Sequence, residues 1–164
     1  MFKKLRIVAV VLLLAMLSTL TACSGSTVSF TIPEDLAEFF VPGEISDDAS
    51  VTFNDDGSIS IEMPASSHAE LMQEMRDGLI ESLDSFTAEY VSIQDITYNN
   101  RLTEFTVVVN REAFENSFDG FVVWGISFSA SFFHLFNGNP DTQFTINIQD
   151  AATMEIFDTH VFPE

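Results

Sequence analysis

The stretch Phe121–Phe136, FVVWGISFSASFFHLF, decides the fold, because it is the most apolar part of the chain after the N-terminal segment and fits two structures. From Trp124 to Phe132, apolar residues alternate with small or polar ones, which is the pattern of a strand. On a helical wheel, a longer stretch sorts into an apolar and a polar side. We favour a helix from Arg111 to about Asn137 and keep a strand over 121–133 as the alternative.

Residues at both ends of this stretch favour the helix. Asn110 can cap the first turn, and Glu112 lies near the positive end of the helix dipole. Gly138 suits the position after the last turn, and Pro140 follows it. The predicted helix therefore has a start signal and a stop signal.

The wheel also predicts which side of this helix is buried. The apolar arc holds Phe114, Phe118, Phe121, Val122, Phe128, Phe132 and Phe136. The opposite arc holds Glu112, Asn116, Asp119, Ser127, Ser131 and His134. Gly125 and Ser129 lie in the apolar arc, where small side chains let a helix approach a sheet closely. The arc covers more than half the wheel, so Trp124 and Leu135 form a candidate interaction face for a partner or the bilayer surface, unless residues 28–40 cover them.

Strand pairs flank this helix. Alternating apolar residues predict hairpins over 51–63, 91–110 and 142–162, with turns at 55–57, 99–100 and 150–152. A change of phase after Ile93 predicts a bulge near Gln94 and Asp95. Ahead of the first hairpin, 28–32 alternates like a strand and 33–40 suits a short helix. The 55–57 turn lacks the ligand spacing of an EF-hand.

A second long helix is expected from Ser67 to about Ser85. Ser67 and Glu70 match a capping box. An apolar stripe follows at helical spacing: Leu71, Met72, Met75, Leu79, Leu83 and Phe86. The element order ββαββαββ predicts an α+β fold, in which an antiparallel sheet of about six strands carries both long helices on one face.

The N-terminal segment has the layout of a secretory signal peptide. Lys3, Lys4 and Arg6 precede an apolar run that starts at Ile7, and small residues precede Cys23. The run Ile7–Leu20 has 14 residues, fewer than the roughly 20 that an uncleaved transmembrane anchor, the alternative, would need.

Leu20-Thr21-Ala22-Cys23 resembles a lipobox, the site at which bacterial lipoproteins are lipidated and cleaved. The resemblance implies cleavage between Ala22 and Cys23, a diacylglycerol on Cys23 and export to the extracytoplasmic face of the cell membrane. Two acyl chains suffice for stable anchoring. The expected organisation is a signal peptide over 1–22, a lipidated cysteine and short tether over 23–27, and a single α+β domain over 28–164.

The charge after cleavage is strongly negative. All 25 acidic residues but only three basic ones, Arg76, Arg101 and Arg111, follow residue 22, which gives a net charge of −22 and no lysine. Phosphate binding needs Lys and Arg, so nucleic acid is excluded as a partner. A cationic peptide, a basic protein or divalent cations would be attracted. Solubility or adaptation to a salty habitat would also account for the charge.

The sequence predicts no catalytic site, cofactor or metal. His68, His134 and His160 lie on three different elements and match no ligand spacing such as H-E-x-x-H. Cys23 is the only cysteine, so no disulfide or Cys-based zinc site can form. No P-loop or G-x-S-x-G sequence occurs. Only an apolar cleft enclosing two carboxylates would favour an envelope hydrolase.

Several short segments combine turn, cap and packing signals: 57–61, the helix start at 67–68, 96–99 before 102–105, and 136–138. These segments resemble a family of small lipoproteins predicted in many Gram-positive bacteria, whose molecular function is uncharacterised. The family carries over no catalytic residue, and Phe133-His134 departs from its Tyr-Gln pair. We therefore expect a membrane-anchored, non-enzymatic binding or accessory lipoprotein. An immunity-type lipoprotein that captures cationic peptides is the alternative.

Overall fold

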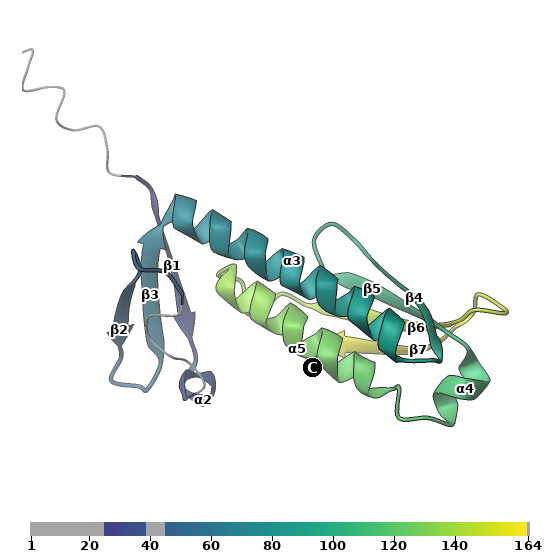
Figure 1. Ribbon diagram of the computed structural model, residues 1–164. Helices are drawn as coiled ribbons and strands as arrows, with labels where there is room; N and C mark the ends of the chain where they lie inside the picture. The colour runs from purple at the N-terminus through teal and green to yellow at the C-terminus, as the bar shows by residue number, and fades with distance from the viewer. Residues whose placement is uncertain (1–24, 39–44, 164) are drawn as a thin grey trace, which may run out of the picture.

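The structure is a computed structural model that describes residues 25–38 and 45–163. The predicted signal peptide, its cleavage site at Ala22 and the lipidation site Cys23 lie outside these residues, as does the end of the short helix predicted over 33–40. The fold is α+β, as expected, but its strands form two sheets in place of one (Figure 1).

The first sheet has the order β1-β3-β2 and is antiparallel. Its strands are β1 (Thr27–Ile32), β2 (Ser50–Phe53) and β3 (Ile59–Pro64). The predicted hairpin turn is confirmed at Gly57, whose φ of 83° is easily adopted only by glycine. The short helix α2 (Glu34–Ala37) follows β1 directly after Pro33. The strand predicted over 28–32 is confirmed as β1, which is an edge strand of this sheet.

The second sheet has the order β4-β5-β6-β7. Its strands are β4 (Ile93–Tyr98), β5 (Glu104–Val109), β6 (Phe144–Asp150) and β7 (Ile156–Phe162). The predicted bulge is confirmed between Ile93 and Asp95. The purely antiparallel arrangement is wrong, because β5 and β6 are parallel. The helical crossover between them returns the chain to the end of the sheet where β5 began, which parallel strands require.

The long helix α3 (Ala65–Glu89) connects the two sheets. Its 25 residues extend about 37 Å at 1.5 Å per residue. The N-terminal half packs with the first sheet through Leu71 and Met75, and the C-terminal half packs with the second through Leu79 and Leu83. The predicted capping box is wrong, because Ser67 lies inside the helix and Pro64 precedes its first residue.

The helix predicted over 111–137 is two helices, α4 (Arg111–Glu115) and α5 (Phe121–Phe136). The cap is confirmed, since Asn110 Oδ1 accepts a hydrogen bond from the Ala113 amide at 3.0 Å. The break between the helices holds Asp119, which accepts a hydrogen bond from the Ser92 amide at 3.2 Å. The strand alternative for 121–133 is wrong.

The stop at Gly138 is confirmed. Its φ is 74°, and its amide donates to the Leu135 carbonyl at 3.0 Å while the Asn139 amide donates to the His134 carbonyl at 2.9 Å. This pair of bonds is a Schellman motif.

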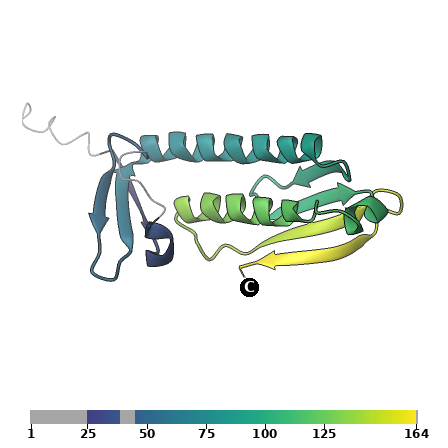
Figure 2. The same cartoon turned by 60° about the horizontal axis from the view of Figure 1, so that its bottom comes forward.

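Helices α3 and α5 lie side by side, with the first sheet at one end of the pair (Figure 2). The apolar core is divided into two buried clusters, one at each sheet. Helix α5 contributes Val122, Val123, Ile126 and Ala130 to the cluster at the second sheet, and Leu135 and Phe136 to the cluster at the first. Among the described residues, no helix combines the length and apolarity needed to cross a bilayer.

Candidate functional site

Large aromatic side chains are exposed along the outer face of α5 and just before its first residue. The exposed fractions are 84% for Phe118, 63% for Phe121, 70% for Trp124 and 65% for Phe128. Steps of three and four residues place the last three on one side of the helix, and Phe118 stacks on Phe121 with ring centroids 6.4 Å apart. We call these four residues the aromatic stripe. An exposed apolar surface of this kind marks an interaction site more often than a scattered single residue does.

A hollow of about 350 Å³ lies between Trp124, in the aromatic stripe, and β7. Asp158, His160 and Phe162 point into it, because the sheet register places them opposite Ile148, Ile146 and Phe144, which are buried under the helices. Its lining is Phe114, Gly120, Val123, Trp124, Ile148, Asp158, His160 and Phe162. The helix-facing side of the edge strand β7 therefore forms one wall, and α5 forms the other.

A second hollow, of about 340 Å³, continues from Trp124 toward α2. It shares Trp124 and Phe162 with the first, so the two form one groove along α5. The wall at this end is Pro33, Leu36, Phe128, Phe132, Leu135 and Pro140, with Ser127 and Ser131 between them. We call the combined feature the α5–β7 groove. Its mostly apolar lining with a few polar groups is typical of ligand sites.

The charges around the groove are negative. Asp158 Oδ2 lies 3.1 Å from His160 Nε2 within the lining, and Glu34 and Asp35 occupy the first turn of α2 next to Pro33 and Leu36. No arginine is among the residues that line either hollow.

Two of the arginines have other partners. Arg76 Nη1 donates to the Asn100 carbonyl at 3.0 Å. Arg111 Nε donates to Glu115 Oε1 at 2.8 Å, and its guanidinium lies 4.4 Å from the centre of the Phe157 ring.

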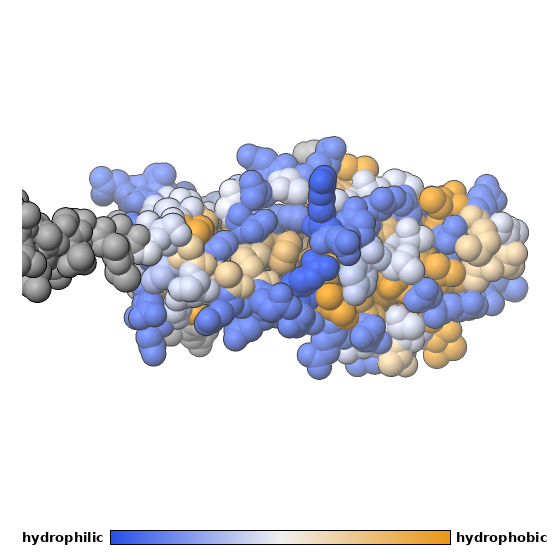
Figure 3. Space-filling model, turned by 90° about the horizontal axis from the view of Figure 1, so that it is seen from above, coloured by the Kyte–Doolittle hydropathy of each residue, from blue (hydrophilic) through white to orange (hydrophobic). Residues whose placement is uncertain are grey.

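Viewed from above, the surface is largely hydrophilic, and hydrophobic residues are more frequent toward the end away from the grey N-terminal trace (Figure 3).

The predicted interaction face is divided by the structure. Trp124 lies at the centre of the groove, but Leu135 is only 5% exposed and belongs to the buried cluster of the first sheet. Residues of the segment 28–40 pack against the C-terminal end of α5, with the Phe30 ring 5.2 Å from that of Phe136. The prediction that Leu135 is an exposed contact is therefore wrong, and its side chain forms part of the groove wall.

The predicted buried side of the helix is only partly right. Val122 and Phe136 are buried as predicted, but Phe118, Phe121 and Phe128 are exposed, whereas Ser127 and His134, assigned to the polar side, are buried. The break at 116–120 separates α4 from α5, and the side of α5 that holds Val122 and Ile126 packs into the core of the four-stranded sheet. The width of the apolar arc signalled surplus apolar surface, but not which part of it stays exposed.

Gly125 allows close approach, but to α3 and not to a sheet as predicted. A Cβ atom at this position would lie 2.6 Å from Cζ of Phe86, which is closer than any Cβ contact tolerates. The small residue thus sets the spacing of the two long helices.

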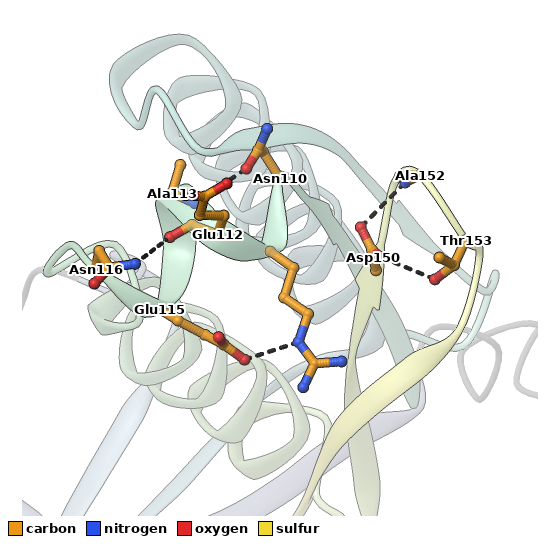
Figure 4. Close-up of polar contacts among 9 residues, drawn as sticks. Asn110, Glu112, Ala113, Glu115, Asn116, Asp150, Ala152 and Thr153 are labelled. Carbon is orange, nitrogen blue, oxygen red and sulfur yellow. Dashed lines mark hydrogen bonds and ion pairs between the residues drawn. The ribbon is translucent and has the colours of Figure 1, made fainter.

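A polar cleft of about 560 Å³ lies at the other end of the four-stranded sheet, between α4 and the β6–β7 turn (Figure 4). Its groups bond to one another. Asn116 Nδ2 donates to the Glu112 carbonyl at 2.7 Å, and the hydrogen bond that Arg111 donates to the Glu115 carboxylate raises the pKa of Arg111. The backbone amide of Ala152 lowers the pKa of Asp150. The polar groups of this cleft are therefore used in helix caps and turn hydrogen bonds of the fold, and we do not take the cleft as the candidate ligand site.

The histidines lie apart from one another. His68 Nε2 donates to the Phe136 carbonyl at 2.8 Å, His134 Nε2 donates to the Leu102 carbonyl at 3.0 Å, and His160 pairs with Asp158. Within residues 25–38 and 45–163, no group of three or more His, Cys, Asp or Glu side chains is placed to hold a metal ion.

Comparison of the chain with protein-family models, with curated proteins and with solved structures gives no match in any of the three.

Proposed function

We propose that this protein is a lipoprotein anchored by Cys23 to the extracytoplasmic face of the cell membrane, with a non-enzymatic binding domain whose ligand site is the α5–β7 groove. The observation that carries the binding site is that Trp124 and Phe128 of the aromatic stripe, 70% and 65% exposed, line an apolar groove. The N-terminal sequence, which resembles a lipobox signal peptide, supports the anchor.

A binding role fits the groove better than hydrolysis does. Hydrolysis by paired carboxylates needs two of them around one bond, in environments that separate their pKa values. Asp158 is the one carboxylate among the residues that line the groove, and it faces His160. The aromatic side chains supply contact area for a ligand and no proton-transfer chemistry.

The chemistry of the groove favours a cationic ligand with apolar side chains. A net charge of −22 after residue 22 attracts basic partners over long range, and Asp158 places a negative charge inside the groove. This supports the second candidate function, an immunity-type lipoprotein that captures cationic peptides near the membrane.

The anchor is tested by metabolic labelling with palmitate and detergent phase partitioning of the full chain. We expect the wild-type chain to carry label and enter the detergent phase, and the Cys23→Ala variant to do neither. The neighbouring Ser24→Ala variant is the control and should behave as wild type. An unlabelled wild-type chain in the aqueous phase would overturn the anchor.

The groove is tested through Trp124, the only tryptophan and therefore a reporter in the centre of the site. A basic amphipathic peptide of Lys and Leu should shift its fluorescence to shorter wavelength, and an acidic Glu and Leu peptide of equal length should not. Phe128→Ala should weaken the response. The control variant Val91→Ala removes an exposed apolar side chain outside the groove lining. Equal responses to both peptides would count against a cationic ligand.

A further inference from the structure

We propose that an extended basic segment of a partner binds by adding a fifth strand to the free edge of β7, with alternate side chains entering the α5–β7 groove. This inference rests on the proposed function, because it specifies the ligand class and the binding geometry of the same groove.

The edge of β7 is open to such pairing. β7 is the last strand in the order β4-β5-β6-β7, and β6 is its only neighbour among the described strands. It lies at the outer side of the sheet in the second view of the fold (Figure 2). An edge strand presents unpaired N–H and C=O groups along one side, which an extended chain can bond. β7 has seven residues, long enough for several such bonds.

The side chains of β7 determine which residue types the added strand needs at each position. Residues of neighbouring strands that lie opposite each other point to the same face of a sheet. A residue of the added strand opposite Phe162 would therefore enter the groove below the aromatic stripe, and one opposite Asp158 would enter it four residues away. We expect an apolar residue at the first position and Lys or Arg at the second, so the partner carries a basic and an apolar residue at a spacing of four.

Charge favours this occupant over a second copy of the chain or the bilayer. Two copies, each with a net charge of −22, repel each other and would bring two Asp158 carboxylates near one edge. An anionic membrane surface repels the same charge. A basic segment is attracted both by the net negative charge of the protein and by the Asp158 carboxylate in the groove.

The test uses the full chain with its lipid, reconstituted in phosphatidylcholine vesicles, and synthetic ten-residue peptides with Lys and Leu four positions apart. Two versions carry N-methyl groups on alternate amides, one on the odd and one on the even positions. Alternate amides of a strand face opposite edges, so strand addition requires one set and not the other. Binding is measured by the fluorescence of Trp124 and, independently, by peptide anisotropy.

We expect one methylated peptide to bind like the parent and the other to lose at least about 20-fold in affinity, since each lost hydrogen bond costs roughly five-fold. Trp124→Ala should weaken binding about 30-fold if it is an interface hot spot. Asp158→Asn should weaken it about two- to five-fold, the scale of a cross-strand charge pair. The control Asp77→Asn removes a charge on α3, outside the groove lining, and should change Kd by less than two-fold.

Four results would overturn the inference. Equal binding of both methylated peptides would exclude strand addition while leaving the groove as the proposed ligand site. Lack of binding by the unmethylated peptide would remove both the inference and the cationic-peptide function. A shift of the Trp124 fluorescence on insertion into vesicles without any peptide would assign the groove to the bilayer. A shift that depends only on protein concentration would assign it to a second copy of the chain.

Discussion

Replacing Gly125 by alanine tests how closely α3 and α5 approach each other. A Cβ atom at Gly125 would lie 2.6, 3.2 and 3.4 Å from Cζ, Cε2 and Cε1 of the Phe86 ring. Gly78, in the interior of α3, is the matched control, because a Cβ atom there would meet nothing within 4 Å. Both glycines have helical neighbours on either side, so the substitution changes helix propensity equally at the two positions.

The expected magnitudes follow from two opposing terms. Glycine to alanine in a helix interior stabilises by about 1 kcal/mol. Forcing an extra methyl group into a packed contact costs about 1–3 kcal/mol. Gly78→Ala should therefore raise the free energy of unfolding by about 1 kcal/mol, whereas Gly125→Ala should have an effect between none and a loss of about 2 kcal/mol. The difference between the variants, about 1–3 kcal/mol, measures the contact with Phe86.

Urea unfolding followed by circular dichroism gives these values at fixed pH and salt. The double variant Phe86→Leu with Gly125→Ala completes a mutant cycle, and a smaller loss from Gly125→Ala in the Phe86→Leu background is expected. If Gly125→Ala and Gly78→Ala are equally stabilising, Phe86 does not pack on Gly125 and the helix spacing described above is wrong.

Three further predictions concern stability. Asn110→Ala should lower the free energy of unfolding by about 1 kcal/mol in urea titrations, because the Ala113 amide loses its cap; an unchanged midpoint would contradict the cap. The hydroxyl and amide of Ser58 bond to Asp56 and hold its pKa below the ordinary value. The stabilisation from Asp56 should therefore be complete above the carboxyl pKa of the unfolded chain and be lost as pH falls through the lower folded pKa. Carboxyl NMR titration checks this, and a midpoint at or above that of the unfolded chain would refute it. Millimolar calcium or magnesium should raise the melting temperature beyond sodium chloride of equal ionic strength, by reducing carboxylate repulsion; equal melting temperatures would remove this expectation.

Much of the local structure follows from the sequence alone. The turn at Gly57, the cap at Asn110 and the stop at Gly138 are each set by one residue type with a backbone preference or a short-range bond. The bulge after Ile93 could be seen as a change of alternation. Such signals depend on neighbours within a few residues, so these features can be predicted without knowledge of the tertiary fold. The start of α3 is one exception, because Pro64 joins it directly to β3 and the predicted capping box lies inside the helix. The break between α4 and α5 is another, because Asp119 in it bonds to Ser92, 27 residues earlier.

The candidate site depends on contacts that lie far apart in the sequence. Trp124 could be chosen from the breadth of the apolar arc, but Phe128 and Phe162 could not, because they depend on which side of α5 packs on the four-stranded sheet and on β7 lying at the edge of that sheet. Leu135 is buried and not exposed as predicted, because β1, about 100 residues earlier, packs over that end of α5.

The sequence by itself therefore determined the α+β class, most turns, the acidic charge and the N-terminal segment that resembles a lipobox, because each of these depends on composition or on neighbouring residues. Only the tertiary structure decided that the strands divide into two sheets, that β5 and β6 run parallel, and that the Trp124 side of α5 faces outward. Periodicity identifies which residues share a face of a helix. When both faces are apolar, the packing partners determine which one is buried.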